Sequence, residues 1–321
     1  MSEDAPFAPG IPTPGDAPIG AFDSGYGGLT VLREIARLMP QEDTVFIGDS
    51  AYFPYGPKPL KDVRGRVMRI CSHLAEMGCK LIVIACNTAT AAGLKDAQRE
   101  FGIPIIGVVE PGSRAAVYET HTRKVGVIAT QGTVNSGAYV DAIQNLDAGI
   151  EVVQAATPEL VDIAEKGIQY DSPERPVSDE TMRRLRSSML PMREEGIDTL
   201  VLGCTHFPLV TYLVEGLIGD DVTLVSSAEE TAREVRGILF RQRQLKGVTN
   251  PTSSARGLQD PLIKGPFRSV AMQGNEDDVV EVGKRVFLTT SEDVKGFETF
   301  AMRVIGRVLA GYEPTFEHVR V

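Results

Sequence analysis

The amino-acid sequence predicts an α/β protein: two pseudo-symmetric α/β domains with mainly parallel sheets, and an active site at the domain interface. Continuous runs of Val, Ile and Leu without polar alternation are typical of strands that are covered on both faces. These runs alternate with stretches of helical spacing, which indicates β-α units. Two of the runs, Leu81–Ala85 and Thr199–Gly203, are each followed directly by a cysteine. This repetition favours an internal pseudo-repeat.

The first part of the chain contains four expected β-α units. A helix follows the first strand because Leu29, Leu32 and Ile35 recur at helical spacing. The other elements are identified by the same two patterns, aliphatic runs for strands and helical spacing for helices. In chain order they are the strands Pro18–Phe22, Thr44–Gly48, Leu81–Ala85 and Pro104–Val109, and the helices Leu29–Met39, Leu60–Met77 and Ala89–Glu100.

The series of units restarts near residue 124. One helix is expected to begin at Thr157-Pro158, because proline suits the first helical position. A polar, proline-bearing linker covers Asp171–Ser178. The remaining expected elements are the strands Lys124–Ile128, Glu151–Gln154, Thr199–Gly203 and Val222–Val225, and helices through Tyr139 and Ile143, up to Glu195, and over Ala228–Gln242.

The two ends of the chain and one internal stretch lack these patterns. Residues 1–17 are rich in proline and read as a disordered tail. Residues 245–279 are rich in Gly, Pro, Ser and charge, and read as an irregular insertion. After them we expect a strand over Lys284–Thr289, a helix over Phe297–Leu309 and an extended end over Glu313–Val321. The predicted first domain is therefore 18–111 plus 226–321, and the second is 112–225.

Length and composition limit the class of protein. A chain of 321 residues with 42% apolar residues has the size of two domains and enough apolar surface to bury cores. The net charge of −10 argues against a general nucleic-acid or membrane-surface role, since both need cationic patches. The sequence has no bilayer-length apolar stretch and no signal peptide at Met1–Pro6. We therefore expect a cytoplasmic protein that acts on a small-molecule substrate.

Four cysteines in a chain of this length do not make a disulfide framework. Cys71 and Cys79 lie on or at the end of a helical pattern and are expected to pack in the core. Cys86 and Cys204 instead lie beyond strand ends, where open α/β sheets bind ligands. Each precedes residues that suit a helix start, and a helix N-terminus lowers a thiol pKa from about 8.5 towards neutrality. We expect the two thiols to face each other across one pocket as an acid/base pair.

Other residues near these strand ends are candidates for the same pocket. His206 lies two residues after Cys204, where it could tune the thiol or shuttle its proton. Asp23 ends the first strand and could bind an ammonium group or assist Cys86. The glycine-rich turn that follows it lacks nucleotide-binding spacing. The loop containing Tyr55-Gly56 follows the second strand and could form one wall of the pocket. The histidines and cysteines lack zinc-site spacing, so no metal is expected.

Two classes of enzyme fit these residues. In the first, one thiolate removes the α-proton of an amino acid and the opposite thiol returns a proton to the other face. The sequence offers no clear site for a metal or pyridoxal phosphate, and this reaction needs neither. In the second, Cys204 is a nucleophile activated by His206, as in an amidase or acyltransferase. Residues i and i+2 do not face each other on a helix, and Cys86 would be idle. A non-enzymatic binding module is a third possibility that leaves both thiols unexplained.

Six motifs in order resemble those of the glutamate racemases, cofactor-independent enzymes that make D-glutamate for peptidoglycan. The resemblance covers about residues 18–240, with a family-like ending at Phe287–Thr290. The motifs are Ala21-Phe-Asp-Ser-Gly-Tyr-Gly-Gly-Leu-Thr-Val31, Gly48-Asp-Ser-Ala-Tyr-Phe-Pro-Tyr-Gly56, Ala85-Cys-Asn-Thr-Ala89, Gly107-Val-Val-Glu-Pro-Gly112, Gly132-Thr-Val134 and Leu202-Gly-Cys-Thr-His-Phe-Pro-Leu209.

The resemblance implies a cofactor-independent racemase that interconverts L- and D-glutamate and assembles as a homodimer. It implies that Cys86 and Cys204 are the catalytic acid/base pair, assisted by Asp23 and His206 respectively. An aspartate racemase of the same superfamily is the alternative within this class. The implied substrate contacts are Asp23, Ser24, Pro54, Tyr55, Gly56, Asn87, Thr88, Thr130, Thr205 and His206.

The chain departs from the family pattern in three places. Around Ala156–Leu160 the family usually has a cysteine followed by Pro-Leu, whereas here Thr157, Glu159 and Asp162 replace that pattern. Glu165, just beyond, matches a weaker family position, as does Thr130. The insertion at 245–279 and the proline-rich tail also fall outside the usual pattern.

Overall fold

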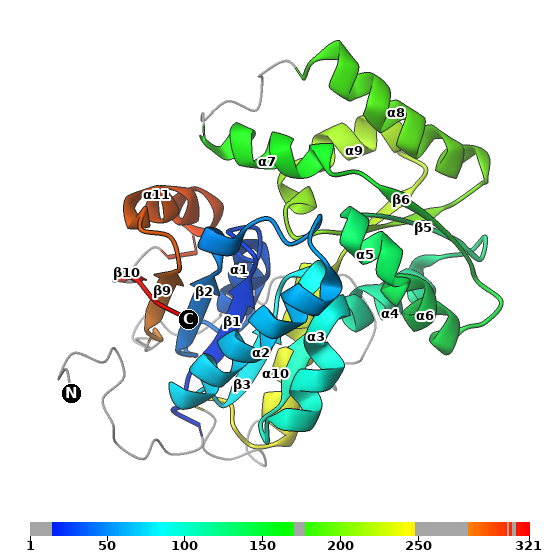
Figure 1. Ribbon diagram of the computed structural model, residues 1–321. Coiled ribbons are helices and arrows are strands. Elements are labelled where there is room, and N and C mark those ends of the chain that lie inside the picture. Colours follow the sequence, from blue (N-terminus) through cyan, green and yellow to red (C-terminus); the bar gives the residue numbers. More distant parts are fainter. Residues whose placement is uncertain (1–14, 170–176, 248–281, 307, 310–312) are drawn as a thin grey trace, which may run out of the picture.

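The structure, a computed structural model, describes residues 15–169, 177–247, 282–306, 308–309 and 313–321. In these residues there are two separate sheets, and every strand pairing within them is parallel. Figure 1 shows the two sheets in two lobes of the molecule, each covered by helices. The predicted fold class is confirmed.

The first sheet has six strands in the order β10-β9-β2-β1-β3-β4. Every residue of β1, β2 and β3 is buried, which explains why their sequences are continuous aliphatic runs rather than alternating ones. The strands are β1 (Ile19–Asp23), β2 (Thr44–Gly48), β3 (Leu81–Ile84), β4 (Ile105–Gly107), β9 (Arg285–Thr289) and β10 (Thr315–His318).

The second sheet has four strands in the order β6-β5-β7-β8. Taken in chain order these are the second, first, third and fourth strands of their set, which is also the order of β2, β1, β3 and β4 in the first sheet. The two sheets thus repeat one topology, as the two cysteine-terminated runs suggest. The strands are β5 (Lys124–Ala129), β6 (Glu151–Ala156), β7 (Thr199–Gly203) and β8 (Thr223–Ser226).

Helices cover both sheets, and two of them begin where the chain passes between the lobes. α4 follows β4 and α10 follows β8, and these two helices pack against each other. The helices flanking the first sheet are α1 (Leu29–Leu38), α2 (Leu60–Glu76), α3 (Asn87–Glu100), α10 (Ser227–Arg241) and α11 (Val294–Ile305). The others are α4 (Val109–Glu119), α5 (Gln131–Ser136), α6 (Ala138–Leu146), α7 (Glu159–Gln169), α8 (Asp179–Glu194) and α9 (Thr211–Ile218), with short 3-10 turns at Ser50–Tyr52 and Phe207–Leu209.

The first sheet separates two apolar clusters. Alternate strand residues face opposite sides, so that Ile19 and Ala21 belong to one cluster while Phe22 belongs to the other. Cys71 and Cys79 lie in the second cluster, 0% and 3% exposed, as predicted for packing cysteines. All four cysteines are free and buried.

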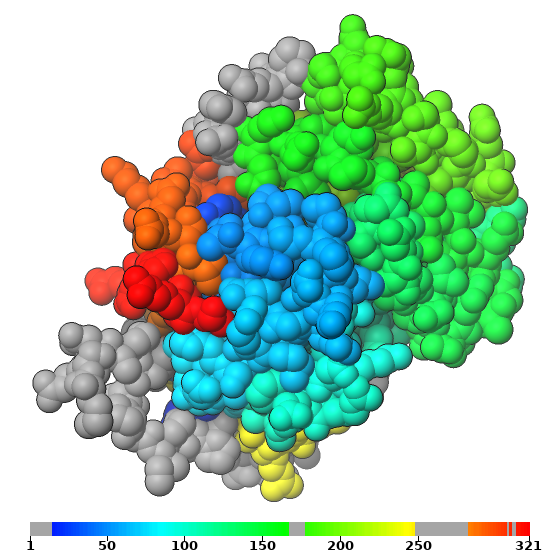
Figure 2. All heavy atoms as spheres, in the orientation of Figure 1, coloured from blue at the N-terminus to red at the C-terminus, as the bar shows by residue number. Residues whose placement is uncertain are grey.

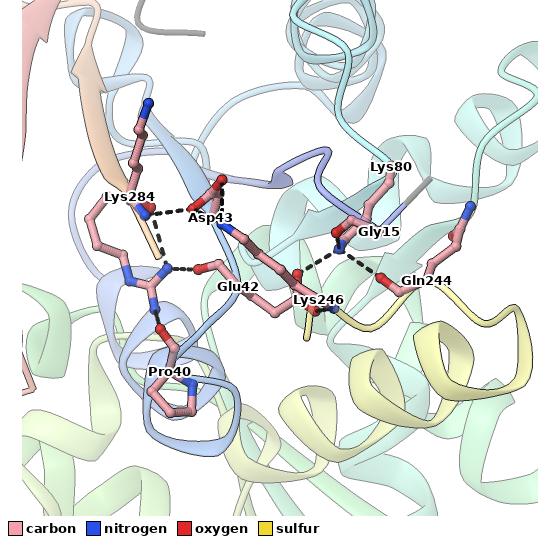
Figure 3. A network of polar contacts seen from close by, with 9 residues as sticks. Gly15, Pro40, Glu42, Asp43, Lys80, Gln244, Lys246 and Lys284 are labelled. Atoms are coloured by element: carbon pink, nitrogen blue, oxygen red, sulfur yellow. Dashed lines mark hydrogen bonds and ion pairs between the residues drawn. The ribbon is translucent and has the colours of Figure 1, made fainter. Parts of the chain in front are cut away.

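A buried polar network holds the amino-terminal edge of the first sheet together (Figure 3). Lys80 donates to Glu42 Oε2 at 2.6 Å and to the carbonyl oxygens of Gly15 and Gln244, both at 2.8 Å. The Lys80 and Glu42 side chains are 2% and 0% exposed. Asp43 accepts from Lys246 Nζ at 3.0 Å and from the backbone N–H of Lys284 at 2.6 Å. The network therefore joins strand entrances that are distant in the sequence.

Several predicted boundaries change in the structure. The strand expected to reach Val109 ends at Gly107, because Val109 already begins α4. The final helix begins at Val294 rather than Phe297, after an Asp293 cap, and ends at Ile305. α9 was not predicted. Within the predicted tail, Ala17 is 7% exposed and Gly15 binds Lys80, so this part packs against the sheet.

Other predictions lie wholly or mostly outside the described residues. These are the tail before residue 15, most of the linker Asp171–Ser178 and nearly all of the 245–279 insertion. The predicted domain boundaries fall within α4 and at the end of β8, and the division into two domains stays a prediction. No helix in the described part of the chain combines the length and apolar character needed to cross a membrane.

Candidate active site

Cys86 and Cys204 occupy equivalent places in the two sheets. Cys86 lies between β3 and α3, and Cys204 directly follows β7. β3 and β7 are the third strands of their sets, and each is internal in its sheet. The two cysteines are 6% and 7% exposed. They are also close enough for charge on Cys204 to raise the pKa of Cys86. The structure thus brings the two predicted thiols to one region.

The environment of Cys86 differs from the expectation of a lowered thiol pKa. Burial, together with the negative charge of Asp23, raises the pKa of Cys86 to about 12. A hydrogen bond from the backbone N–H of Ala89, at the start of α3, and one with Ser24 act in the opposite direction. The Cys86 Sγ to Ser24 Oγ distance is 3.7 Å. The helix N-terminus therefore acts as predicted, but desolvation outweighs it, and the predicted net shift is wrong for Cys86.

Cys204 lies beside a histidine and a carboxylate. His206 Nδ1 is 3.8 Å from Cys204 Sγ, and His206 Nε2 is 2.6 Å from Glu165 Oε1. Burial acts to lower the pKa of His206, but its hydrogen bonds to Cys204 and Glu165 outweigh burial and raise that pKa well above its ordinary value. The positive charge of His206 is thus stabilised between two partners.

The Cys204–His206 contact corrects a sequence argument. A helix was expected directly after Cys204, on which residues i and i+2 point apart. The structure has a turn there, followed by a 3-10 turn over Phe207–Leu209, and α9 begins only at Thr211. A turn allows the two side chains to approach each other, so the objection to a Cys204–His206 pair does not hold.

Asp23 connects the two lobes. It is fully buried at the end of β1, its Oδ2 accepts from the Gly25 N–H at 3.0 Å, and its Oδ1 accepts from Thr205 Oγ1 at 3.3 Å. Burial raises the pKa of Asp23, although the nearby His206 charge and the hydrogen bonds lower it in part. A second contact, from Thr30 Oγ1 to the Thr205 carbonyl at 3.0 Å, fixes the same turn. Asp23 therefore lies between the two thiol-bearing loops.

The close approach of the two lobes explains why residue 27, in the turn after Asp23, is a glycine. A Cβ atom on Gly27 would lie 2.5 Å from His206 Nδ1 and 2.6 Å from Thr205 Oγ1. Such distances are far below van der Waals contact, so any side chain would push the Cys204 loop away. This glycine therefore serves the close approach of the two lobes.

Threonine hydroxyls form a second bridge between the lobes. Thr88 Oγ1 lies 2.8 Å from Thr130 Oγ1 and 3.2 Å from Thr133 Oγ1. Thr88 belongs to the first turn of α3, and Thr130 caps α5. Nearby, the Gly132 N–H donates to the Gly56 carbonyl at 3.0 Å. The predicted contacts Gly56, Thr88 and Thr130 are thereby brought together.

Tyr55 is held by a buried carboxylate. It is 1% exposed, and its hydroxyl donates to Asp49 Oδ2 at 2.5 Å. Arg66 and Thr290 hold the same carboxylate at 2.6 to 2.9 Å. Pro54, directly before Tyr55, is exposed, and its carbonyl accepts a hydrogen bond from Lys58 Nζ at 2.8 Å. On the face in Figure 2, blue atoms from near residue 50 pack directly against green atoms of the second lobe.

Sequence reasoning missed several residues of this region. Thr133 lies within the Gly132-Thr-Val134 motif and Tyr139 lies on α6, the next helix, but neither was given a role from the sequence. Asp49, directly after β2, was likewise given no role. Glu165, which matches a weaker family position, was named but not paired with His206; it reaches His206 from α7, which begins at Glu159 within the stretch that departs from the family pattern. Among the described residues, no group of three or more His, Cys, Asp and Glu side chains is arranged to hold a metal ion.

The His206–Glu165 pair predicts a pH-dependent contribution to stability. Because the pKa of His206 is raised in the folded state, the pair stabilises the protein fully below the unfolded pKa of about 6.5 and loses its effect as pH rises through the folded pKa. Glu165→Gln should therefore lower the free energy of unfolding by about 2 kcal/mol near pH 6. The difference from wild type should shrink at higher pH, as measured by urea denaturation. A difference that grows with pH would contradict the assignment.

Comparisons with known proteins identify the family of the chain. The family model for Asp/Glu/hydantoin racemase matches residues 27–235. The glutamate racemase of Corynebacterium glutamicum is 48% identical over 256 residues, which cover 78% of this chain and 91% of that relative. A glutamate racemase isoform from Bacillus anthracis has 34% identity and a TM-score of 0.77, covering 96% of this chain and 98% of its own. The Thermus thermophilus glutamate racemase, solved with β-chloro-D-alanine, has 33% identity and a TM-score of 0.71, covering 97% and 98%. The chain therefore belongs to the Asp/Glu/hydantoin racemase family and, within it, to the glutamate racemases.

Proposed function

We propose that this enzyme, an isomerase by its family, interconverts L- and D-glutamate with Cys86 and Cys204 as a two-thiol acid/base pair. Its product D-glutamate would supply peptidoglycan synthesis. The observation that supports this most directly is the pair of buried thiols at equivalent strand ends of two sheets of the same topology. The choice of glutamate as the substrate rests on the relatives that are named glutamate racemase.

Two thiols are sufficient to balance the protons of the reaction. One thiolate takes the α-proton and becomes a thiol, while the opposite thiol gives its proton to the other face of the carbanion-like centre and becomes a thiolate. The product therefore leaves an enzyme with the two protonation states exchanged, ready for the reverse direction. Before substrate binds, a Cys86 thiol with a pKa of about 12 is protonated at neutral pH. The positive charge of a bound α-ammonium group would lower that pKa.

Neutral donors and one carboxylate suit an amino-acid dicarboxylate. Ser24, Thr88 and Asn87 are 2% to 7% exposed, and their hydroxyl or amide groups are able to donate to carboxylate oxygens, whereas the predicted contact Thr205 already donates its hydroxyl proton to Asp23. Asp23 would supply a negative charge on the Cys86 side for an ammonium group. The predicted contact set contains no arginine, so substrate carboxylates would be bound without a fixed positive charge other than His206.

The activity is tested by following the α-hydrogen of glutamate by proton NMR in D2O. We expect the enzyme to incorporate deuterium into both enantiomers of glutamate without added cofactor. The same experiment with D-aspartate distinguishes a glutamate racemase from the alternative, an aspartate racemase. Faster turnover of D-aspartate than of D-glutamate would reject glutamate as the substrate. No exchange with either amino acid would reject the racemase itself.

One observation favours a second candidate function. The Cys204, His206 and Glu165 contacts resemble a nucleophile, its base and an orienting carboxylate, as in a cysteine amidase or acyltransferase. This alternative predicts an acyl group trapped on Cys204, visible by mass spectrometry, and no need for Cys86. In the racemase the same contacts would hold the Cys204 and His206 side chains in position.

The homodimer and the cytoplasmic location remain proposals. Four free, buried cysteines are typical of a reducing compartment. Light scattering coupled to size-exclusion chromatography would give the mass of the assembly in solution, and a mass of 34.7 kDa would reject the dimer.

A further inference from the structure

In the side-chain amide of Asn87 the oxygen has a hydrogen-bond partner, whereas the nitrogen has none among the described residues. Asn87 is 2% exposed and is the first residue of α3, directly after Cys86. Its Oδ1 accepts a hydrogen bond from the hydroxyl of Tyr139 at 2.7 Å. Its Nδ2 is buried and has no hydrogen-bond partner among the described residues. A buried amide donor without a partner costs about 1–3 kcal/mol, so this group needs an acceptor that the described chain does not supply.

Tyr139 reaches Asn87 from the other lobe. It belongs to α6, which packs on the second sheet, and it is fully buried. The residue pair is separated by 52 positions in the sequence. Tyr139 also takes a hydrogen bond from Ser227, the first residue of α10. A Cβ atom on Gly112 in α4 would lie 3.5 Å from the Tyr139 hydroxyl. The hydroxyl therefore lies where both helices that follow the crossings between the lobes meet the start of α3.

The hydrogen-bond roles at this point are directional. A tyrosine hydroxyl has one proton to donate, and an amide has one acceptor end and one donor end. If Ser227 donates to the tyrosine oxygen, the tyrosine proton is available for Asn87 Oδ1. The amide is then fixed with its NH2 end turned away from Tyr139. Burial raises the pKa of Tyr139 well above its ordinary value, which keeps the hydroxyl protonated at neutral pH.

We propose that Tyr139 is a positioning residue that turns the Asn87 NH2 group towards a carboxylate of the bound substrate. The proposal rests on the racemase function proposed above, since it takes the ligand to be glutamate. The carboxylate would satisfy the buried Nδ2 donor next to the thiol that exchanges the α-proton. Because Tyr139 belongs to the opposite lobe, the donor is correctly oriented only when the lobes are together.

The test compares Tyr139→Phe with wild type by kinetics and by binding. Loss of the hydroxyl frees the amide to rotate, and we expect KM for D-glutamate to rise by about 10-fold, the effect of one hydrogen bond to a charged group, with a smaller change in kcat. Binding is measured by calorimetry in a Cys86→Ser/Cys204→Ser background, in which glutamate is not converted. The dissociation constant should rise by a similar factor there. This second measurement separates the two proposals, because it does not depend on racemisation.

Three further measurements distinguish positioning from general packing. In an Asn87→Ala background, Tyr139→Phe should have no additional effect on KM or on the dissociation constant. Tyr118→Phe, on an exposed tyrosine of α4, should leave both constants unchanged. In the wild-type protein the Asn87 side-chain amide signal in ¹⁵N NMR should shift when D-glutamate is added. An unchanged amide signal, or an equal effect of Tyr139→Phe with and without Asn87, would overturn the proposal.

Discussion

Replacing either Cys86 or Cys204 by alanine is expected to lower the rate of glutamate racemisation by about 10²- to 10⁴-fold, the usual contribution of a positioned acid or base. Each substitution removes the only proposed proton carrier on one face of the substrate. Both residues are buried next to different partners, Ser24 for Cys86 and His206 for Cys204, so neither thiol can replace the other. The loss of racemisation is measured by following the circular dichroism of a glutamate solution over time.

Cys71→Ala is the matched control for these variants. Cys71 is a buried thiol on α2 and packs in the same apolar cluster as Cys86, but it has no proposed role in the reaction. Its removal should cost stability through a small cavity while the racemisation rate stays at the wild-type value. If Cys86→Ala retained full racemisation, the two-thiol mechanism would be wrong, and a reaction on Cys204 alone would become the better explanation.

Lys80→Met is expected to destabilise the protein by about 3–5 kcal/mol, because it leaves a buried carboxylate without its charge partner. Glu42 is fully buried, and the Lys80 ammonium group is its partner at 2.6 Å. The same ammonium group holds the carbonyls of Gly15 and Gln244, so the substitution also leaves two acceptors unpaired. The free energy of unfolding in urea gives the loss.

A double variant separates charge from packing at this position. Adding Glu42→Gln to Lys80→Met should restore much of the lost stability, because the amide is neutral and still accepts from the Lys246 N–H. Arg183→Met provides an exposed control, because it breaks a 2.7 Å ion pair with Glu180. The Arg183 and Glu180 side chains are 72% and 52% exposed. This substitution should cost less than about 1 kcal/mol. Equal losses from Lys80→Met and Arg183→Met would show that burial of the pair is unimportant.

The sequence patterns were sufficient to predict the strands that position the thiols. β1, β3 and β7 are buried along their whole length, so local composition alone identifies them. β4 was more difficult, since Val108 and Val109 continue its aliphatic run although the strand ends at Gly107 and α4 begins at Val109. Short α9 was missed because eight residues offer little periodic signal.

The contacts around the thiols could not be predicted from local patterns. Glu165 reaches His206 across 41 residues and Tyr139 reaches Asn87 across 52, and neither separation has a sequence signature. The thiol pKa of Cys86 was predicted with the wrong sign, because a motif shows the helix start but not the depth of burial. The geometry of Cys204 and His206 likewise depended on whether a turn or a helix followed the strand.

The repeated topology has a consequence for the kinetics of the enzyme. L- and D-glutamate have the same free energy in solution, so kcat/KM must be equal for the two directions of the proposed reaction. The two lobes nevertheless surround their thiols differently, with Asp23 and Ser24 on one side and His206 and Glu165 on the other. This asymmetry cannot bias the equilibrium. It can appear only as a compensated difference in which the enantiomer with the larger kcat also has the larger KM.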